Sequence, residues 1–357
     1  MSLLNKDIIT PDEASAIVLG AYQTTTAALP FASILPDQFT GLSVEWTPNQ
    51  DDPEVDEMKF STWDAEAPYG RTVGGEKLSY TSMLPLRKRM RVSEKDIANG
   101  NISMTNGDLK TTLSDYFVQL GKELAYRLEK ARVAVAVDAK LGITESNEDA
   151  AWDYARDSAL STSLTTTKTW DKTGDPVKDL RTWSDLIDDK KGARPTIMVT
   201  TRKVVNALTS NAAIINYLFR GQGSTLPALV SENDVKSVLS LYTGIQDIYV
   251  VDERYRDFAR QSKITLPGGV KSFFPENTIL LIPAFGDVNM GYTALGPTAE
   301  AQTPAYGISR EKNAGPIGAV LNTPSSTGIR GLRERYCIAG SCAVQQHFEG
   351  HCTDRMM

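Results

Sequence analysis

Residues 275–301 read PENTILLIPAFGDVNMGYTALGPTAEA and say more about the fold than any other stretch of the chain. Thr278 to Ile282 has the leucine and β-branched composition of a buried strand, and Pro283 ends it. Glycine, alanine, threonine and proline then follow at close intervals, and such small residues let neighbouring backbones approach closely. Almost no side chain in the loop is suited to chemistry. The stretch therefore indicates a packing role rather than turnover of a substrate.

Length and composition place the chain among soluble globular proteins. At 357 residues it is long enough for two or three packed units, and its 41% hydrophobic and 23% charged content is ordinary. The net charge of −6 gives no general attraction to nucleic acid. No apolar run approaches the roughly 20 residues that span a bilayer. Asp7, Asp12 and Glu13 lie where a secretory signal would be cationic and then apolar. We therefore expect a cytoplasmic product without membrane association.

Residues 1–43 predict an arm with little core of its own. Thr10, Pro11 and Glu13 form a helix start with a capping box. The helix fades into the threonines 24–26, and an extended, largely apolar segment with two prolines follows. Such an arm needs another surface to lie on.

Residues 44–98 predict a long hairpin. Two strand-like runs, MKFSTW and KLSYTSMLPLRKRMRVS, flank a connection that contains glycines. The hairpin has too few apolar residues for a core, and an isolated two-stranded hairpin is marginally stable in water. We therefore expect it to rest on a neighbour.

The two ends of this hairpin carry opposite charges. The charged residues are Asp51, Asp52, Glu54, Asp56 and Glu57 at one end and Arg87, Lys88, Arg89 and Arg91 at the other. One interpretation is contact between copies of the protein, since opposite charges select partners. A second is a solvated hairpin whose charges do nothing specific. A third is nucleic-acid contact by RKRMR, which the nearby acidic residues disfavour.

Residues 106–141 carry the strongest helical pattern in the chain. Asp108 is a capping residue, and Gly142 is a stop signal. Apolar residues recur at steps of three and four, at Leu109, Leu113, Tyr116, Leu120, Leu124, Leu128, Ala131 and Val135. Such a helix is roughly 50 Å long at 1.5 Å per residue. The stripe fits packing on a sheet as well as a coiled coil.

The following residues predict an α/β unit. Asp175 and Pro176 begin a second amphipathic helix. From residue 195, strand-like PTIMVT, DIYVVD and NTILLIPA alternate with helical segments, one of them capped by Ser231 and Asp234. This alternation is typical of a mixed sheet with helices. The last strand-like run, GIRGLRERYCIAGSCAVQQHF, is expected to return to the long helix.

A metal site is the main chemical alternative. Its candidate zinc ligands are Cys337, Cys342, His347 and His351, with Cys352 beside them. The spacing lacks the tight first pair of common zinc modules, and CIAGSCAV resembles an apolar strand in which cysteine is a small hydrophobe. The glycine-containing loops lack the spacing of a dinucleotide or phosphate motif. Both histidines follow the α/β unit, so the usual general base is missing from it. We expect no catalytic residue, cofactor or metal.

The order of these pieces resembles the major capsid proteins of tailed bacteriophages, with the Hong Kong 97-type fold. The phrases DPVKDLRTWSDLI, GARPTIMVT and NTILLIPAFGDVNMGYTALGPTAEA are most similar to the lambda-type family, major capsid protein E. The resemblance covers nearly the whole chain and implies an α+β fold. The implied parts are an N-terminal arm at 1–43, an E-loop hairpin at 44–98, a P-domain at 99–194 with its spine helix at 108–141, an A-domain at 195–328, and a return strand to the P-domain with a tail at 329–357.

The resemblance also implies a function in assembly and no enzymatic activity. Pentamers and hexamers of the chain would form an icosahedral shell around double-stranded DNA, without sequence-specific binding. Scaffold, portal and decoration proteins are the implied partners. The chain would reside in the virion after assembly in the host bacterial cytoplasm. Two alternatives stay open, namely an encapsulin-like nanocompartment shell and a zinc-binding soluble protein or enzyme using Cys337, Cys342, His347 and His351.

Overall fold

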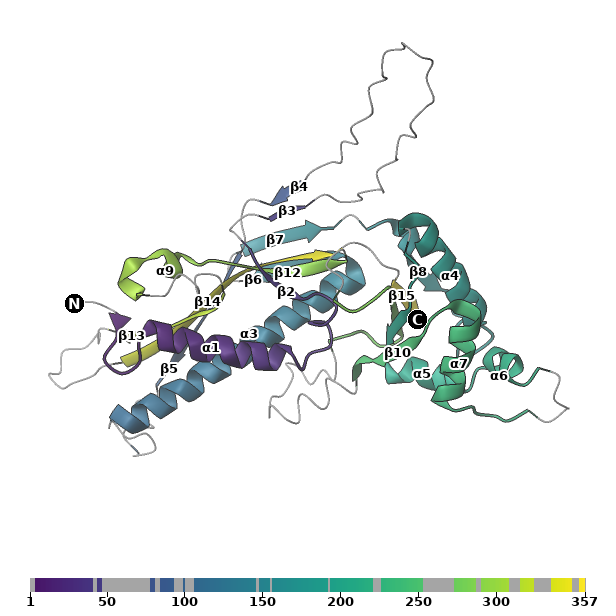
Figure 1. Cartoon of the computed structure of the whole chain (residues 1–357), viewed down its shortest axis with the longest axis horizontal. Coiled ribbons are helices and arrows are strands. Elements are labelled where there is room, and N and C mark those ends of the chain that lie inside the picture. Colours follow the sequence, from purple (N-terminus) through teal and green to yellow (C-terminus); the bar gives the residue numbers. More distant parts are fainter. Residues whose placement is uncertain are drawn as a thin grey trace, which may run out of the picture.

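The fold is α+β, with two mixed sheets that share one long helix (Figure 1). The structure is a computed structural model. It describes residues 4–40, 44–46, 78–80, 84–92, 99, 106–145, 148–154, 156–191, 193–220, 226–252, 273–286, 290–307, 315–323, 335–348 and 353–356. Within these ranges, no helix combines the length and the apolar character needed to cross a membrane.

The larger sheet is built around the 14-residue strand β14, Arg335–Phe348. One edge of β14 pairs first with β13 (Ile317–Thr323) and then with β12 (Gly291–Gly296), both antiparallel. Its other edge pairs antiparallel with β5 (Leu84–Arg91). The short strands β1 (Leu4–Asn5) and β2 (Asp37–Phe39) extend the sheet beyond β13 and β12. The return strand expected near the C-terminus is therefore the centre of this sheet.

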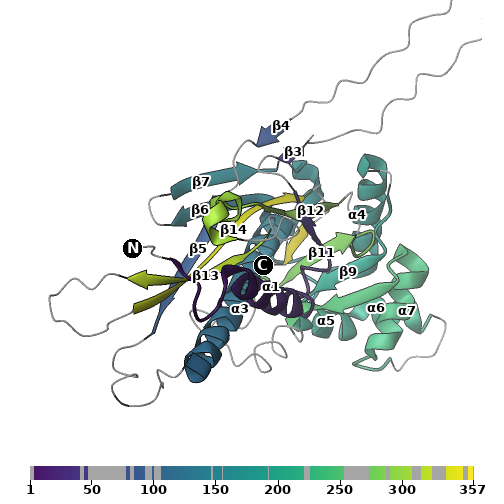
Figure 2. The ribbon, with the colours of Figure 1, turned by 60° about the vertical axis from the view of Figure 1, so that its left-hand side comes forward.

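Two crossing helices pack on this sheet, as Figure 2 shows. Helix α1, Pro11–Thr26, begins with the predicted capping box, because the Thr10 and Glu13 side chains each accept from the other's backbone N–H. Helix α3, Asn106–Asp138, is the predicted long helix. A Cβ atom at Gly121 of α3 would lie 2.6 Å from the Val18 carbonyl oxygen of α1. The absence of a side chain at Gly121 therefore sets how closely the two helices approach.

The N-terminal segment is part of the core of its own chain. Leu29, Phe31, Ile34 and Leu35, which follow α1, are each at most 1% exposed. They pack against the C-terminal half of α3 and against the second sheet. The sequence predicted an arm that lies on another surface. For residues 4–40, that surface belongs to the same chain.

The long helix ends three residues before the predicted limit at Leu141. Ala139 adopts a left-handed conformation (φ 51°) and donates its backbone N–H to the Val135 oxygen at 2.8 Å. Arg156 donates to the oxygens of Val135, Ala136 and Val137. A guanidinium here satisfies terminal carbonyls and opposes the negative end of the helix dipole. The chain then forms the hairpin of β6 (Lys140–Glu145) and β7 (Glu148–Asp153), so Gly142 lies in a strand.

The second sheet has the order β10-β9-β11-β15-β8. Its strands are β8 (Ser161–Leu164), β9 (Ile197–Thr200), β10 (Asp247–Val250), β11 (Thr278–Ile282) and β15 (Thr353–Met356). Pairing is parallel for β10 with β9 and for β15 with β8, and antiparallel for the two pairs that β11 makes. The sheet is therefore mixed, as the alternating pattern predicted.

Helices cover this sheet on both faces. On β11, Ile279 and Leu281 face a core formed with α4 (Pro176–Lys191), α5 (Arg202–Thr209), α6 (Ala212–Leu218) and α7 (Glu232–Thr243). Leu280 and Ile282 face the opposite core, which contains α3. Consecutive strand side chains point to opposite faces. Both faces are covered, which explains why β11 is apolar throughout and fully buried.

The border between the two sheets differs from the expected boundary at residues 194 and 195. Strand β8 and helix α4, from the expected P-domain range, belong to the second sheet and its core. Strands β12 and β13, from the expected A-domain range, belong to the larger sheet. The chain crosses from one sheet to the other within residues 275–301. Strand β11 belongs to the second sheet and β12 to the larger sheet, and the segment that begins at Pro283 connects them.

The remaining described elements are short. Of the predicted hairpin at 44–98, strand β3 (Val44–Trp46) pairs antiparallel with β4 (Leu78–Tyr80). The described rest of its second run is β5, which pairs with β14 in the larger sheet. Helix α9 (Ala299–Gln302) and two 3-10 turns, at Ser158–Leu160 and Pro304–Tyr306, complete the described structure.

Candidate functional site

Strand β5 presents its basic residues to both faces of the larger sheet. Lys88 Nζ lies 2.6 Å from Glu123 Oε2 of α3, so Lys88 points to the face that the helices cover. Arg87 Nη2 lies 3.6 Å from Glu300 Oε1 of α9, on the opposite face. Both basic side chains remain 59% exposed. Exposed ion pairs contribute about 0–1 kcal/mol each, so these pairs leave both residues available for other contacts.

The structure describes only part of the predicted contact set. Arg89 is an exposed residue of β5, two positions after Arg87. Arg91 is the last residue of the strand and pairs with Cys337 of β14. The acidic members, Asp51, Asp52, Glu54, Asp56 and Glu57, lie outside the described residues.

A buried polar network joins the N-terminal segment to α3 and β12, and its centre is Arg132. The Arg132 side chain is fully buried and contacts the Asp37 carboxylate. Its Nε donates to Thr293 Oγ1 at 2.9 Å, and one Nη donates to the Tyr22 hydroxyl at 3.3 Å. Thr293 in turn donates to the Leu35 backbone oxygen at 3.1 Å. One guanidinium thus connects α1, β2, α3 and β12.

Glu129 completes this network one helical turn earlier. Its Oε2 lies 3.5 Å from Arg132 Nη1, and both side chains have zero exposure. Its Oε1 accepts from the Phe31 backbone N–H at 2.9 Å. Tyr22 donates its hydroxyl to Asp37 Oδ2 at 2.7 Å. The network is therefore built from both charged and neutral hydrogen bonds.

The electrostatics of the network keep Arg132 charged and Tyr22 neutral. Burial alone disfavours the charged guanidinium, but Tyr22, Asp37 and Glu129 outweigh it and raise the pKa of Arg132. Burial also raises the pKa of Tyr22 above its ordinary value, and Arg132 only partly opposes this. The two side chains therefore act as stable donors rather than as a proton-transfer pair.

The sequence gives one signal for this network. Glu129 and Arg132 lie three residues apart on α3, between the buried residues Leu128, Ala131 and Val133. A charged pair at helical spacing within an apolar stripe is an unusual feature, because unpaired charges are rarely buried. The sequence does not reveal Asp37, Tyr22 and Thr293 as the partners.

The zinc candidates lie along an extended strand. Cys337, Cys342 and His347 are all in β14, opposite Leu321, Leu86 and Tyr292 respectively. Five residues of strand span roughly 16 Å. One zinc ion has ligands at about 2.0–2.3 Å, so neighbours at this spacing cannot share it. His351 and Cys352 lie outside the described residues, and within the described ones no group of three acidic, histidine or cysteine side chains could hold a metal.

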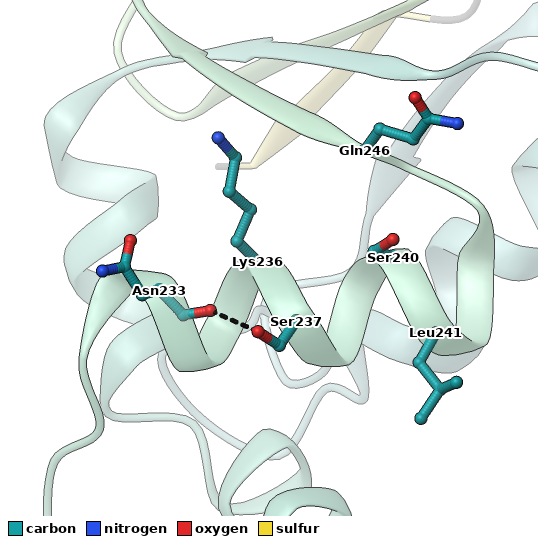
Figure 3. Close-up of a pocket in the computed structure, with 6 residues that line it drawn as sticks. All are labelled: Asn233, Lys236, Ser237, Ser240, Leu241 and Gln246. Carbon is teal, nitrogen blue, oxygen red and sulfur yellow. Dashed lines mark hydrogen bonds between the residues drawn. The ribbon is translucent and has the colours of Figure 1, made fainter.

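A shallow groove lies between α7 and the start of β10 (Figure 3). Its lining consists of Asn233, Lys236, Ser237, Ser240, Leu241 and Gln246. Ser237 donates its hydroxyl to the Asn233 backbone oxygen at 2.9 Å, and Lys236 Nζ lies 2.5 Å from Asp247 Oδ1. Lys236 is thus held in an ion pair and no histidine lines the groove, so the arrangement does not support activation of the lining serines.

Comparison with known proteins identifies similar chains. A family model described as "Phage major capsid protein E" matches residues 50–325. A phage-related protein from Bordetella bronchiseptica RB50 has a similar structure, with a TM-score of 0.53 and 11% identity over 99% of this chain and 97% of that chain. The putative capsid protein of a prophage of E. coli CFT073 gives a TM-score of 0.52 and 15% identity over 95% and 98% of the two chains. At these identities the likeness shows the fold alone. Comparison with curated proteins finds no match.

Proposed function

This chain belongs to the phage major capsid protein E family, and from that premise we propose how its surfaces serve assembly. It is a major capsid protein with the Hong Kong 97-type fold. The observation that carries this conclusion is the family match over most of the chain. The match favours a phage shell over both an encapsulin-like compartment and a zinc-dependent protein.

We propose that the two sheets correspond to the two regions of a capsid subunit. The larger sheet with α1 and α3 would be the peripheral P-domain. The second sheet with α4 to α7 would be the axial A-domain, whose tip meets other copies at five- and six-fold axes. The core that α3 and β11 share supports this proposal, since it packs the two regions against each other within one subunit. Residues 44–98 would be the extended loop that lies over the next subunit.

We propose that this protein is not an enzyme and that its main partner is itself. Pentamers and hexamers would close into a shell around double-stranded DNA, because repeated contacts between different faces of one chain close into shells when the geometry permits. The net charge of −6 supports a shell that does not hold DNA tightly during packaging. Scaffold, portal and decoration proteins, and assembly in the host bacterial cytoplasm before incorporation into the virion, are part of this proposal.

Deletion of the hairpin outside its described strands tests the role of residues 44–98. A chain in which a short glycine-serine linker replaces residues 51–77 retains β3, β4 and β5. We expect it to fold, because none of the described core residues is removed. We also expect it to form no shells under conditions in which the full chain does. Sedimentation velocity with electron microscopy measures this, and circular dichroism checks folding. Normal shells from the deletion would contradict the proposed role.

A further inference from the structure

We propose that the face of β5 carrying Arg87 and Arg89, here called the basic strip, binds the acidic segment 51–57 of a second copy of this chain. The inference rests on the proposed function, because it names the surfaces through which one subunit meets the next. Of the three interpretations of the hairpin charges that the sequence left open, it selects contact between copies of the chain.

Strand geometry separates the basic residues of β5 into two sets. Consecutive residues of a strand point to opposite faces. Lys88 pairs with Glu123 of α3, and its neighbours Leu86 and Met90 pack against the cores beneath the sheet. Arg87 and Arg89 therefore share the other face. This assignment agrees with the contact between Arg87 and Glu300 of α9.

The basic strip has an excess of positive charge over its described surroundings. Glu300 is the carboxylate that pairs with Arg87, at 3.6 Å, and its side chain is 27% exposed. Arg89 is exposed and forms no ion pair with any residue in the described ranges. Arginine at an exposed position suits contacts with carboxylates, because its planar group binds both oxygens. The strip thus presents one guanidinium more than its described partners balance.

The acidic segment matches this strip in charge and in spacing. Residues 51–57 read DDPEVDE, which places five carboxylates in seven residues. Asp52, Glu54 and Asp56 recur at every second residue, and so do Arg87 and Arg89. In paired strands, alternate side chains on one face repeat at roughly 7 Å. An extended chain bound against the strip would therefore present these carboxylates at the spacing of the two guanidinium groups.

The proposed function favours a second copy over the same chain, because residues 44–98 would lie over the next subunit and would carry the acidic segment with them. Strand β5 itself is held in the larger sheet of its own chain, where it pairs antiparallel with β14.

The position of β5 leaves room for another subunit. It pairs with β14 along one edge, and no other described strand pairs with its second edge. Exposed charged residues at such an edge discourage unselective strand pairing while permitting a partner of opposite charge. Packaged DNA is the other polyanion that could meet arginines. The acidic segment is favoured because it belongs to the same hairpin and because the whole chain is negative.

Charge reversal with mixing tests the proposal. One variant carries Arg87→Glu and Arg89→Glu, and the other carries Asp52→Lys, Glu54→Lys and Asp56→Lys. Each variant alone is expected to yield about tenfold fewer assembled particles, since facing like charges are costly. An equimolar mixture is expected to recover capsomers with an even number of subunits, because alternating copies again face opposite charges. Lys88→Gln, on the other face of β5, is the matched control and should assemble normally.

The outcomes separate this inference from the proposed function. Failure of the unaltered chain to assemble would contradict the proposed function itself. Normal assembly of both reversed variants would overturn only the inference. A mixture that does not recover, while one chain carrying all five substitutions does, would place the contact within one subunit and would also overturn it. So would normal assembly with weakened DNA retention by the Arg87→Glu, Arg89→Glu variant. Circular dichroism and thermal unfolding confirm that each variant is folded.

Discussion

Replacing Arg132 by methionine is expected to lower the free energy of unfolding by about 3–5 kcal/mol, as the loss of one partner from a buried ion pair does. The guanidinium is fully buried and faces Glu129, Asp37 and Tyr22. Methionine fills a similar volume but leaves the buried Glu129 carboxylate without the positive charge it faces. Urea unfolding of the purified chain, followed by circular dichroism, measures the change.

Two further variants make this prediction specific to the network. Thr293→Val removes one neutral hydrogen bond to Arg132 and should cost only about 1 kcal/mol. Combining Arg132→Met with Glu129→Gln removes the unpaired charge of the Glu129 carboxylate. The double variant should therefore recover part of the free energy of unfolding that Arg132→Met loses. Hydrogen exchange should increase first in residues 29–39, which the network holds against α3. An Arg132→Met loss no larger than that of Thr293→Val would contradict a joining role for Arg132.

Gly121→Ala is expected to destabilise the protein, because forcing extra volume into a packed site costs about 1–3 kcal/mol. A Cβ at this position would lie 2.6 Å from the Val18 oxygen and 2.9 Å from the Ala21 Cβ, so α1 and α3 must move apart. The cost should exceed the gain of about 1 kcal/mol that alanine brings to a helix interior. Thermal and urea unfolding report the net effect.

Gly20→Ala is the matched control for this prediction. Gly20 is an exposed residue of α1, and a Cβ there would meet nothing within 4 Å. The same substitution should therefore stabilise the protein by about 0.5–1 kcal/mol through helix propensity alone. Opposite signs at Gly121 and Gly20 would identify the helix crossing as the cause. A stabilising effect at both positions would contradict the close approach.

The elements that sequence predicted well are those with local signals. The capping boxes at Thr10 and Ser231 are confirmed, because a cap depends on residues three positions apart. The long helix and the buried strand at Thr278–Ile282 follow from apolar periodicity and composition, and both are confirmed. The end of α3 was predicted less well, because Ala139 rather than a glycine takes the left-handed position.

The distribution of strands between the two sheets depends on distant partners. Strand β15 lies beside β8 although more than half of the sequence separates them, and β1 lies beside β13 although most of the sequence separates them. No local pattern encodes such pairing. The Arg132 network has the same character, since Asp37 and Thr293 are 95 and 161 residues away. For the candidate contact site, the sequence alone identified the charged residues of β5. The alternation of side chains along a strand then assigns Lys88 to one face of the sheet and Arg87 and Arg89 to the other. The contacts with Glu123 and Glu300 needed the structure.

Sedimentation velocity of the purified full-length chain, combined with negative-stain electron microscopy, tests the central claim most directly. The claim is that this member of the capsid family assembles with itself. The expected result is large particles that appear as closed shells, together with free pentamers or hexamers. A folded chain that sediments as a monomer across salt and protein concentrations, and shows no shells, sheets or capsomers, would contradict the account.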